Sequence, residues 1–108
     1  MRSFVGLVAL ISLGAATAAH AQATGSPREG LRIARAQCAE CHRVAGERGG
    51  SPNLAAPSFE QIANTRGMSR RALTAALRTS HRTMPNLIIP DAEVRDIVAY
   101  IMSLKSKE

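Results

Sequence analysis

The sequence predicts an all-α domain. Apolar residues near the C-terminus recur at the three- and four-residue spacing of one helix face: Val94, Ile97, Val98, Ile101 and Leu104. Upstream, polar residues of the N-cap type precede further segments with helical spacing. No segment shows the alternating apolar and polar residues of a half-buried strand. We therefore expect short helices joined by loops, and no sheet.

The first helix is predicted over residues 27–40. Ser26 is a suitable N-cap, and Pro27 stands at the first helical position, where its missing N–H costs nothing. Gly30 and Ala34 then fall on one face, four residues apart. Side chains this small allow another backbone to approach the helix closely.

A long loop and three more helices follow. Residues 43–57 are rich in Gly, Ser and Pro and show no periodicity, and loops of this length are uncommon unless they line a site. Ser58 starts a second helix, which Gly67 ends, and Ser69 starts a third. The last helix opens at Asp91, with lysines near its negatively polarised C-terminal end.

The N-terminal residues 1–21 have the order of a secretory signal peptide. A basic residue precedes the ten-residue apolar run 4–13, which is shorter than the roughly 18 residues of a membrane-spanning helix. Small residues follow, so we expect cleavage after Ala21, with Ala23 as the next-best site. The mature domain is then 22–108, exported to the periplasm with no stable membrane span.

The distribution of basic residues argues against nucleic acid as a partner. The chain carries 14 Lys and Arg against 8 Asp and Glu, and one Arg lies in the predicted signal peptide, so the mature net charge is +5. The basic residues are scattered, with no run longer than two. We therefore expect no nucleic-acid binding, and instead an attraction to an acidic face of a partner protein.

The only two cysteines lie in the pentapeptide Cys38-Ala39-Glu40-Cys41-His42. In a Cys-x-x-Cys-His motif the thiols form thioethers with the two haem vinyl groups, and the adjacent imidazole binds the iron. A zinc site would need further ligands, and a thioredoxin-like pair would need a preceding strand. A short-loop disulfide is the remaining alternative. The motif favours one covalent haem c with His42 as the proximal ligand, and so large a group would also fill the thin core of a domain without Trp.

Met84 is the best candidate for the distal iron ligand. It precedes Pro85, which disfavours a helical conformation at Met84. A thioether on such a loop, 42 residues past His42, could reach the opposite face of a haem. Three other side chains compete for this position, the last of them through a bis-histidine site: Met68, Met102 and His81.

These features together resemble the class I c-type cytochromes, which are small soluble monohaem electron carriers. The resemblance extends from Gly30 through the motif to Met84-Pro85 and the final helix, nearly the whole mature chain. It implies a small cytochrome c-like domain whose N- and C-terminal helices pack crosswise, with short helices and loops around one covalent haem. It also implies that Tyr100 packs over Gly30 and Ala34.

The resemblance further implies a proline carbonyl that accepts the second N–H of the His42 imidazole. Ser51-Pro52-Asn53-Leu54 is similar to the family loop that supplies it, which makes Pro52 one candidate for the partner. Pro57 is the alternative. Such a bond fixes the imidazole tautomer and raises its basicity as a ligand.

The function predicted is periplasmic transfer of single electrons through one His/Met-ligated haem c. We expect a monomer that meets redox partner proteins, is not an enzyme, and contains no catalytic residue. Two haem-based alternatives remain: a haem-bearing subunit of a periplasmic oxidoreductase complex, and an open-site sensor or peroxidase-like protein. A haem-free exported binding domain with a disulfide is the third.

Overall fold

Four helices make up the described part of the chain, residues 24–81 and 83–107 of a computed structural model. They are α2 (Pro27–Gln37), α3 (Phe59–Ala63), α4 (Arg70–Arg78) and α5 (Asp91–Ser103). Within these residues no strand forms, and a single isolated bridge joins His81 and Met84. The all-α prediction is confirmed. The predicted signal peptide, residues 1–21, lies outside the described residues.

The helix starts follow the predicted caps. The Ser26 hydroxyl accepts the Glu29 amide at 3.3 Å, and the Ser69 hydroxyl caps α4 in the same way. At α3 the capping box is complete, because Ser58 accepts the Gln61 amide while the Gln61 side chain accepts the Ser58 amide. Local polar residues therefore set where these three helices begin.

Two helices end earlier than predicted. α2 stops at Gln37 instead of residue 40, because the Ala39 amide donates to the Ala34 carbonyl five residues back, out of the helical register, and the Cys41 amide then closes a tighter turn on the Cys38 carbonyl. The segment 38–42 is therefore a turn and not the last turn of the helix. α3 likewise ends at residue 63, and Gly67 adopts a left-handed conformation (φ 79°) in the turn that follows.

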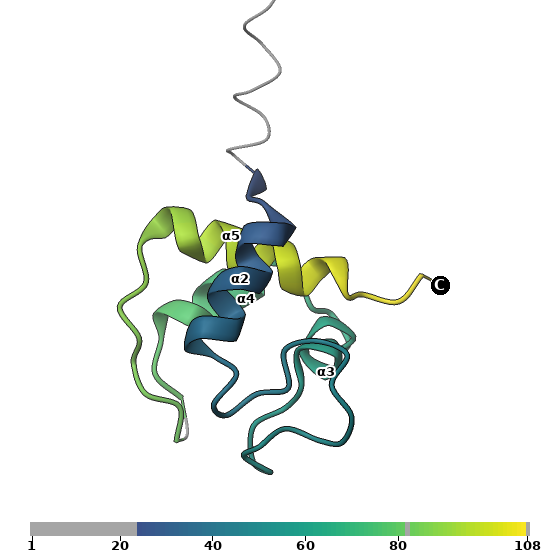
Figure 1. Ribbon diagram of the computed structural model, residues 1–108. Coiled ribbons are helices and arrows are strands. Elements are labelled where there is room, and N and C mark those ends of the chain that lie inside the picture. Colours follow the sequence, from purple (N-terminus) through teal and green to yellow (C-terminus); the bar gives the residue numbers. More distant parts are fainter. Residues whose placement is uncertain (1–23, 82, 108) are drawn as a thin grey trace, which may run out of the picture.

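α2 crosses α5 at very close range (Figure 1). A Cβ atom added to Gly30 would lie 2.0 Å from the Asp96 carbonyl oxygen and 2.7 Å from the Tyr100 Cβ. A hydrogen bond also joins the start of α2 to α5, because the Ser26 amide donates to the Asp96 carboxylate at 2.7 Å. The predicted packing of Tyr100 over Gly30 is confirmed, and its cause is steric: only a residue without a side chain fits there.

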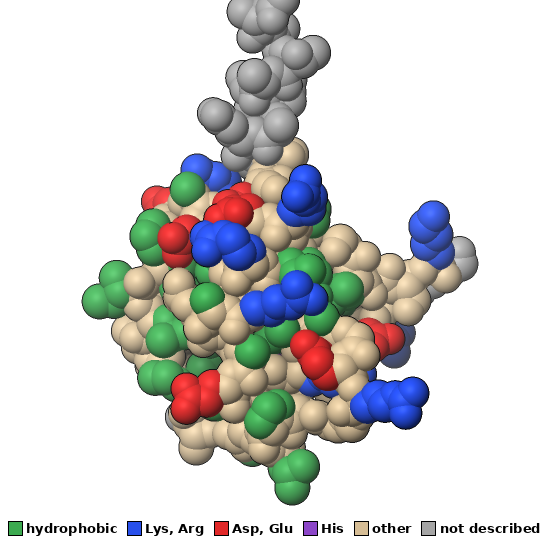
Figure 2. Space-filling view, in the orientation of Figure 1, with side chains coloured by type: hydrophobic (Ala, Val, Ile, Leu, Met, Phe, Trp, Pro, Cys, Tyr) green, Lys and Arg blue, Asp and Glu red, His purple; other side chains and the backbone are tan. Residues whose placement is uncertain are grey.

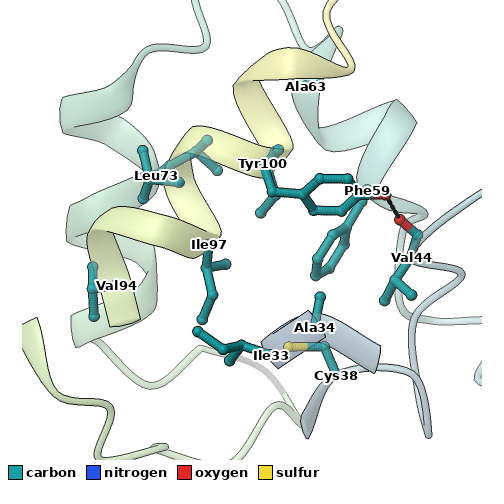
Figure 3. Packing of buried hydrophobic residues seen from close by; sticks show 12 residues of the cluster. Ile33, Ala34, Cys38, Val44, Phe59, Ala63, Leu73, Val94, Ile97 and Tyr100 are labelled. Carbon is teal, nitrogen blue, oxygen red and sulfur yellow. Dashed lines mark hydrogen bonds between the residues drawn. The ribbon is translucent and has the colours of Figure 1, made fainter. Parts of the chain in front are cut away.

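The hydrophobic core lies where α5 meets the other helices (Figure 3). One buried stripe of α5 consists of Val94, Ile97, Val98 and Ile101. Side chains from the other three helices pack against it, including Ile33 and Ala34 of α2, Phe59 and Ala63 of α3, and Leu73 of α4. Four of the five apolar positions predicted for α5 are buried, and Leu104 is partly buried. Among the described residues, no helix has the length and hydropathy needed to cross a membrane.

The loop between α2 and α3 folds back on the turn that follows α2. The Asn53 amide donates to the Cys41 carbonyl at 3.1 Å, and the Ser51 hydroxyl accepts the Arg43 amide at 3.1 Å. The Phe59 amide then donates to the Arg43 carbonyl at 3.0 Å. These bonds give the predicted long loop a defined path beside residues 41–43.

The close crossing predicts a large effect of one methyl group. Gly30→Ala should lower the free energy of unfolding by about 2 kcal/mol and Tm by roughly 10 °C, because α2 and α5 must separate. The higher helix propensity of Ala offsets only about 1 kcal/mol.

Thermal and denaturant unfolding measure this effect. Gly46→Ala is the matched control, since a Cβ at Gly46 meets nothing within 4 Å. A Gly30→Ala protein as stable as the control would contradict the described crossing.

Candidate functional site

A cavity of about 460 Å³ is lined by residues from three segments: the end of α2 with its turn, the loop before α3, and the stretch before α5. Its volume is in the range of cofactor sites. The lining contains the predicted attachment residues and both predicted iron ligands: Cys38, Cys41, His42 and Met84. The structure therefore brings together residues that are up to 46 positions apart in the chain.

The two cysteines differ in their surroundings. Cys38 caps α2 and is only 8% exposed, with its side chain directed toward the core in Figure 3. Burial raises the pKa of the Cys38 thiol, so it is neutral at neutral pH. Cys41 is exposed, and both thiols are free of a disulfide. Both cysteines are among the residues that line the cavity.

His42 is held in one tautomer. Its Nδ1 lies 2.6 Å from the Pro57 carbonyl oxygen, and a carbonyl can only accept, so Nδ1 carries the proton and donates. The lone pair of Nε2 is left free for a metal. The Phe59 ring packs beside the imidazole, with the ring centroids 5.4 Å apart.

Of the two prolines that the sequence left open as partner of His42, Pro57 and not Pro52 lies beside the ring. Pro52 is exposed and is not among the residues that line the cavity. The cause is the path of the loop: Ser51 and Asn53 bond to the backbone of the 41–43 segment, which leaves Pro57 beside the ring.

Met84 lies in the wall contributed by the segment before α5, where it is half-buried. Its amide donates to the His81 carbonyl at 3.1 Å, and His81 also lines the cavity. The other two methionines considered from the sequence, Met68 and Met102, pack against the hydrophobic core and are not among the lining residues. The geometry therefore leaves Met84 and His81 as the two candidates for a distal ligand.

Tyr100 supports the site from α5. Its hydroxyl donates to the carbonyl of Val44, a residue that is only 1% exposed and lies two positions after His42 (Figure 3). Its ring packs against Phe59, with centroids 6.3 Å apart, and Phe59 in turn contacts His42. Sequence reasoning identified Tyr100 as a packing residue but had no signal for this long-range hydrogen bond.

Much of the remaining lining is apolar and, apart from Pro85, was not singled out from the sequence: Ala55, Ala56, Pro85 and Leu87. Leu54 and Ile88, which adjoin lining residues in the chain, are 95% and 98% exposed. These positions carry no periodic or motif signal, because they lie in irregular segments whose paths are set by tertiary contacts.

The donor set fits a covalently attached haem. Two free thiols match the two vinyl groups, and one imidazole with a free Nε2 and one thioether match the two axial positions of the iron. Cys38, Cys41 and His42 would hold the group from one side, and Met84 would reach it from another segment. The apolar lining suits the porphyrin ring.

Comparison with known proteins agrees with this chemistry. The family model described as cytochrome C oxidase, cbb3-type, subunit III matches residues 25–101, well over half of the chain. No curated protein and no solved structure gives a significant match.

The Tyr100 hydrogen bond predicts a loss of stability and a change in its pH dependence. Tyr100→Phe leaves the buried Val44 carbonyl without its partner and should cost about 1–3 kcal/mol. Burial, assisted by the nearby Glu47, raises the pKa of Tyr100 in the folded protein. Above the unfolded pKa, roughly 10, the unfolded chain binds fewer protons, so stability falls as pH rises.

Denaturant unfolding at pH about 8 and about 10.5 separates the two effects. The stability gap between wild type and Tyr100→Phe should shrink at the higher pH. A gap that stays constant would show that Tyr100 does not titrate in this way.

Proposed function

We propose that this chain, which belongs to the cytochrome c oxidase, cbb3-type, subunit III family and is a c-type cytochrome, passes single electrons through one covalently attached haem c. The observation that carries the proposal is the convergence of two thiols, an oriented imidazole and a thioether on one apolar cavity. When bound, the haem supplies an iron that alternates between the ferrous and ferric states.

Attachment is assigned to Cys38 and Cys41. Each of these thiols would add its S–H across one haem vinyl group, with the carbon–sulfur bond on one vinyl carbon and the hydrogen on the other. The tight turn at 38–42, closed on the Cys38 carbonyl, sets the two sulfurs and His42 at fixed separations. His42 is thereby presented to the iron by the same segment that is covalently attached.

The axial ligands are assigned to Nε2 of His42 and the sulfur of Met84. The Pro57 carbonyl fixes the His42 tautomer and makes the imidazole a better electron donor. A thioether opposite an imidazole raises the reduction potential relative to two imidazoles. With His42 and Met84 both holding the iron, the protein would need no substrate site at the metal, which supports a carrier over an open-site sensor or peroxidase.

The proposed location is the periplasm, after removal of the predicted signal peptide, with acidic redox proteins as partners. The chain carries a formal charge of +6. On the face shown in Figure 2 the basic side chains are interspersed with acidic ones instead of forming one patch. We therefore expect steering by the overall field, weakened by salt, more than by a single basic surface.

The family description favours a second candidate, in which the chain acts as a haem-bearing subunit of an oxidase complex. Affinity purification of the tagged chain from detergent-solubilised membranes distinguishes the two. Stable co-purification with oxidase subunits supports the subunit, whereas recovery of a monomer from the soluble periplasmic fraction supports the free carrier.

The distal assignment predicts the effect of one substitution. Met84→Ala should abolish the absorption band near 700 nm that marks a methionine–iron bond, and should lower the midpoint potential, because the thioether favours ferrous iron. The visible and near-infrared spectrum and a redox titration measure both effects.

Met68→Ala is the control, since Met68 packs against the core and does not line the cavity. If Met68→Ala abolished the band while Met84→Ala left it in place, the distal assignment would be wrong.

A further inference from the structure

The turn that carries Met84 also brings a second ligand-type side chain to the cavity. The Met84 amide donates to the His81 carbonyl at 3.1 Å, which closes a four-residue turn. The first and fourth Cα atoms of such a turn lie within about 7 Å of each other. Both side chains line the same cavity.

The His81 imidazole is oriented in the same manner as that of His42. Its Nδ1 lies 3.2 Å from the Thr79 carbonyl oxygen, and this oxygen can only accept, so Nδ1 is the donor. Nε2 is then left with a free lone pair. A backbone carbonyl thus selects the metal-binding tautomer at both histidines of the described chain.

We infer that His81 is a second distal ligand, which binds the iron through Nε2 whenever the Met84 thioether does not. The inference rests on the proposed function, because it requires an iron held by His42. His81 and Met84 would then be two alternative ligands for the same position on the iron. His81 would keep the iron six-coordinate and closed to small external ligands.

Burial explains why Met84 is the ligand under ordinary conditions. Met84 is half-buried in the cavity wall, whereas His81 is exposed to water. Moving His81 onto the iron costs part of that hydration, and Met84 pays no comparable cost. Once the thioether is gone, the tethered imidazole competes at a millimolar or higher effective concentration, because it is attached to the same turn.

Four forms of the purified holoprotein test the inference: wild type, Met84→Ala, His81→Ala, and the double variant Met84→Ala/His81→Ala. Visible spectra report the spin state, and titration with free imidazole reports whether the distal position is open. A second double variant, Met84→Ala/His81→Gln, and the Tm of each protein guard against an effect of misfolding.

The expected result is a low-spin Met84→Ala protein and a high-spin double variant. The apparent Kd for imidazole should be at least about tenfold higher in Met84→Ala than in either double variant, since external imidazole must displace His81. His81→Ala alone should retain the band near 700 nm.

Two other results overturn the inference, and they differ in what they say of the proposed function. If Met84→Ala is high-spin and binds imidazole as tightly as the double variants, His81 is not a ligand, while the His/Met carrier stands. If the wild type is low-spin but lacks the band near 700 nm, Met84 is not the ordinary ligand, and the distal assignment of the proposed function fails as well.

Discussion

The crossing of α2 over α5 is the contact on which the other features of the site depend. Gly30 allows the backbones to approach until the Asp96 carbonyl occupies the place of a side chain. From this crossing, α2 directs Cys38 and the following turn toward the cavity, while α5 directs Tyr100 toward Val44. The absence of a side chain at Gly30 therefore positions both the turn that carries the cysteines and Tyr100, which supports that turn.

The two walls of the cavity are held in different ways. In the wall formed by residues 38–57, backbone hydrogen bonds to the carbonyls of Cys41 and Arg43 hold the loop against the turn that follows α2. The Tyr100 hydroxyl of α5 adds a hydrogen bond to this wall. In the wall formed by the described residues 79–81 and 83–90 no helix forms, and the partly buried Ile89 packs against the core. A firmly held proximal ligand and a distal ligand on a simple turn suit a site in which the distal position can change.

The sequence was most informative where the physics is local. Caps at Ser26, Ser58 and Ser69 and the apolar spacing of α5 predicted the helix starts and most of the core, because each depends on residues within a few positions. The attachment motif is equally local. The sequence left Pro52 and Pro57 open as the partner of His42, because the choice depends on how a 15-residue loop returns past Cys41. That loop was expected to line a site, but which of its residues do so was not predicted.

The central claim is that Cys38 and Cys41 hold a haem covalently beside His42. Its most direct measurement is extraction of the purified protein with acidified acetone, followed by mass spectrometry and iron analysis of the denatured chain. The account predicts that one haem remains bound to each polypeptide and that Cys38→Ser/Cys41→Ser releases it. A wild-type chain that loses its haem on extraction, or that is purified without any, would contradict the account.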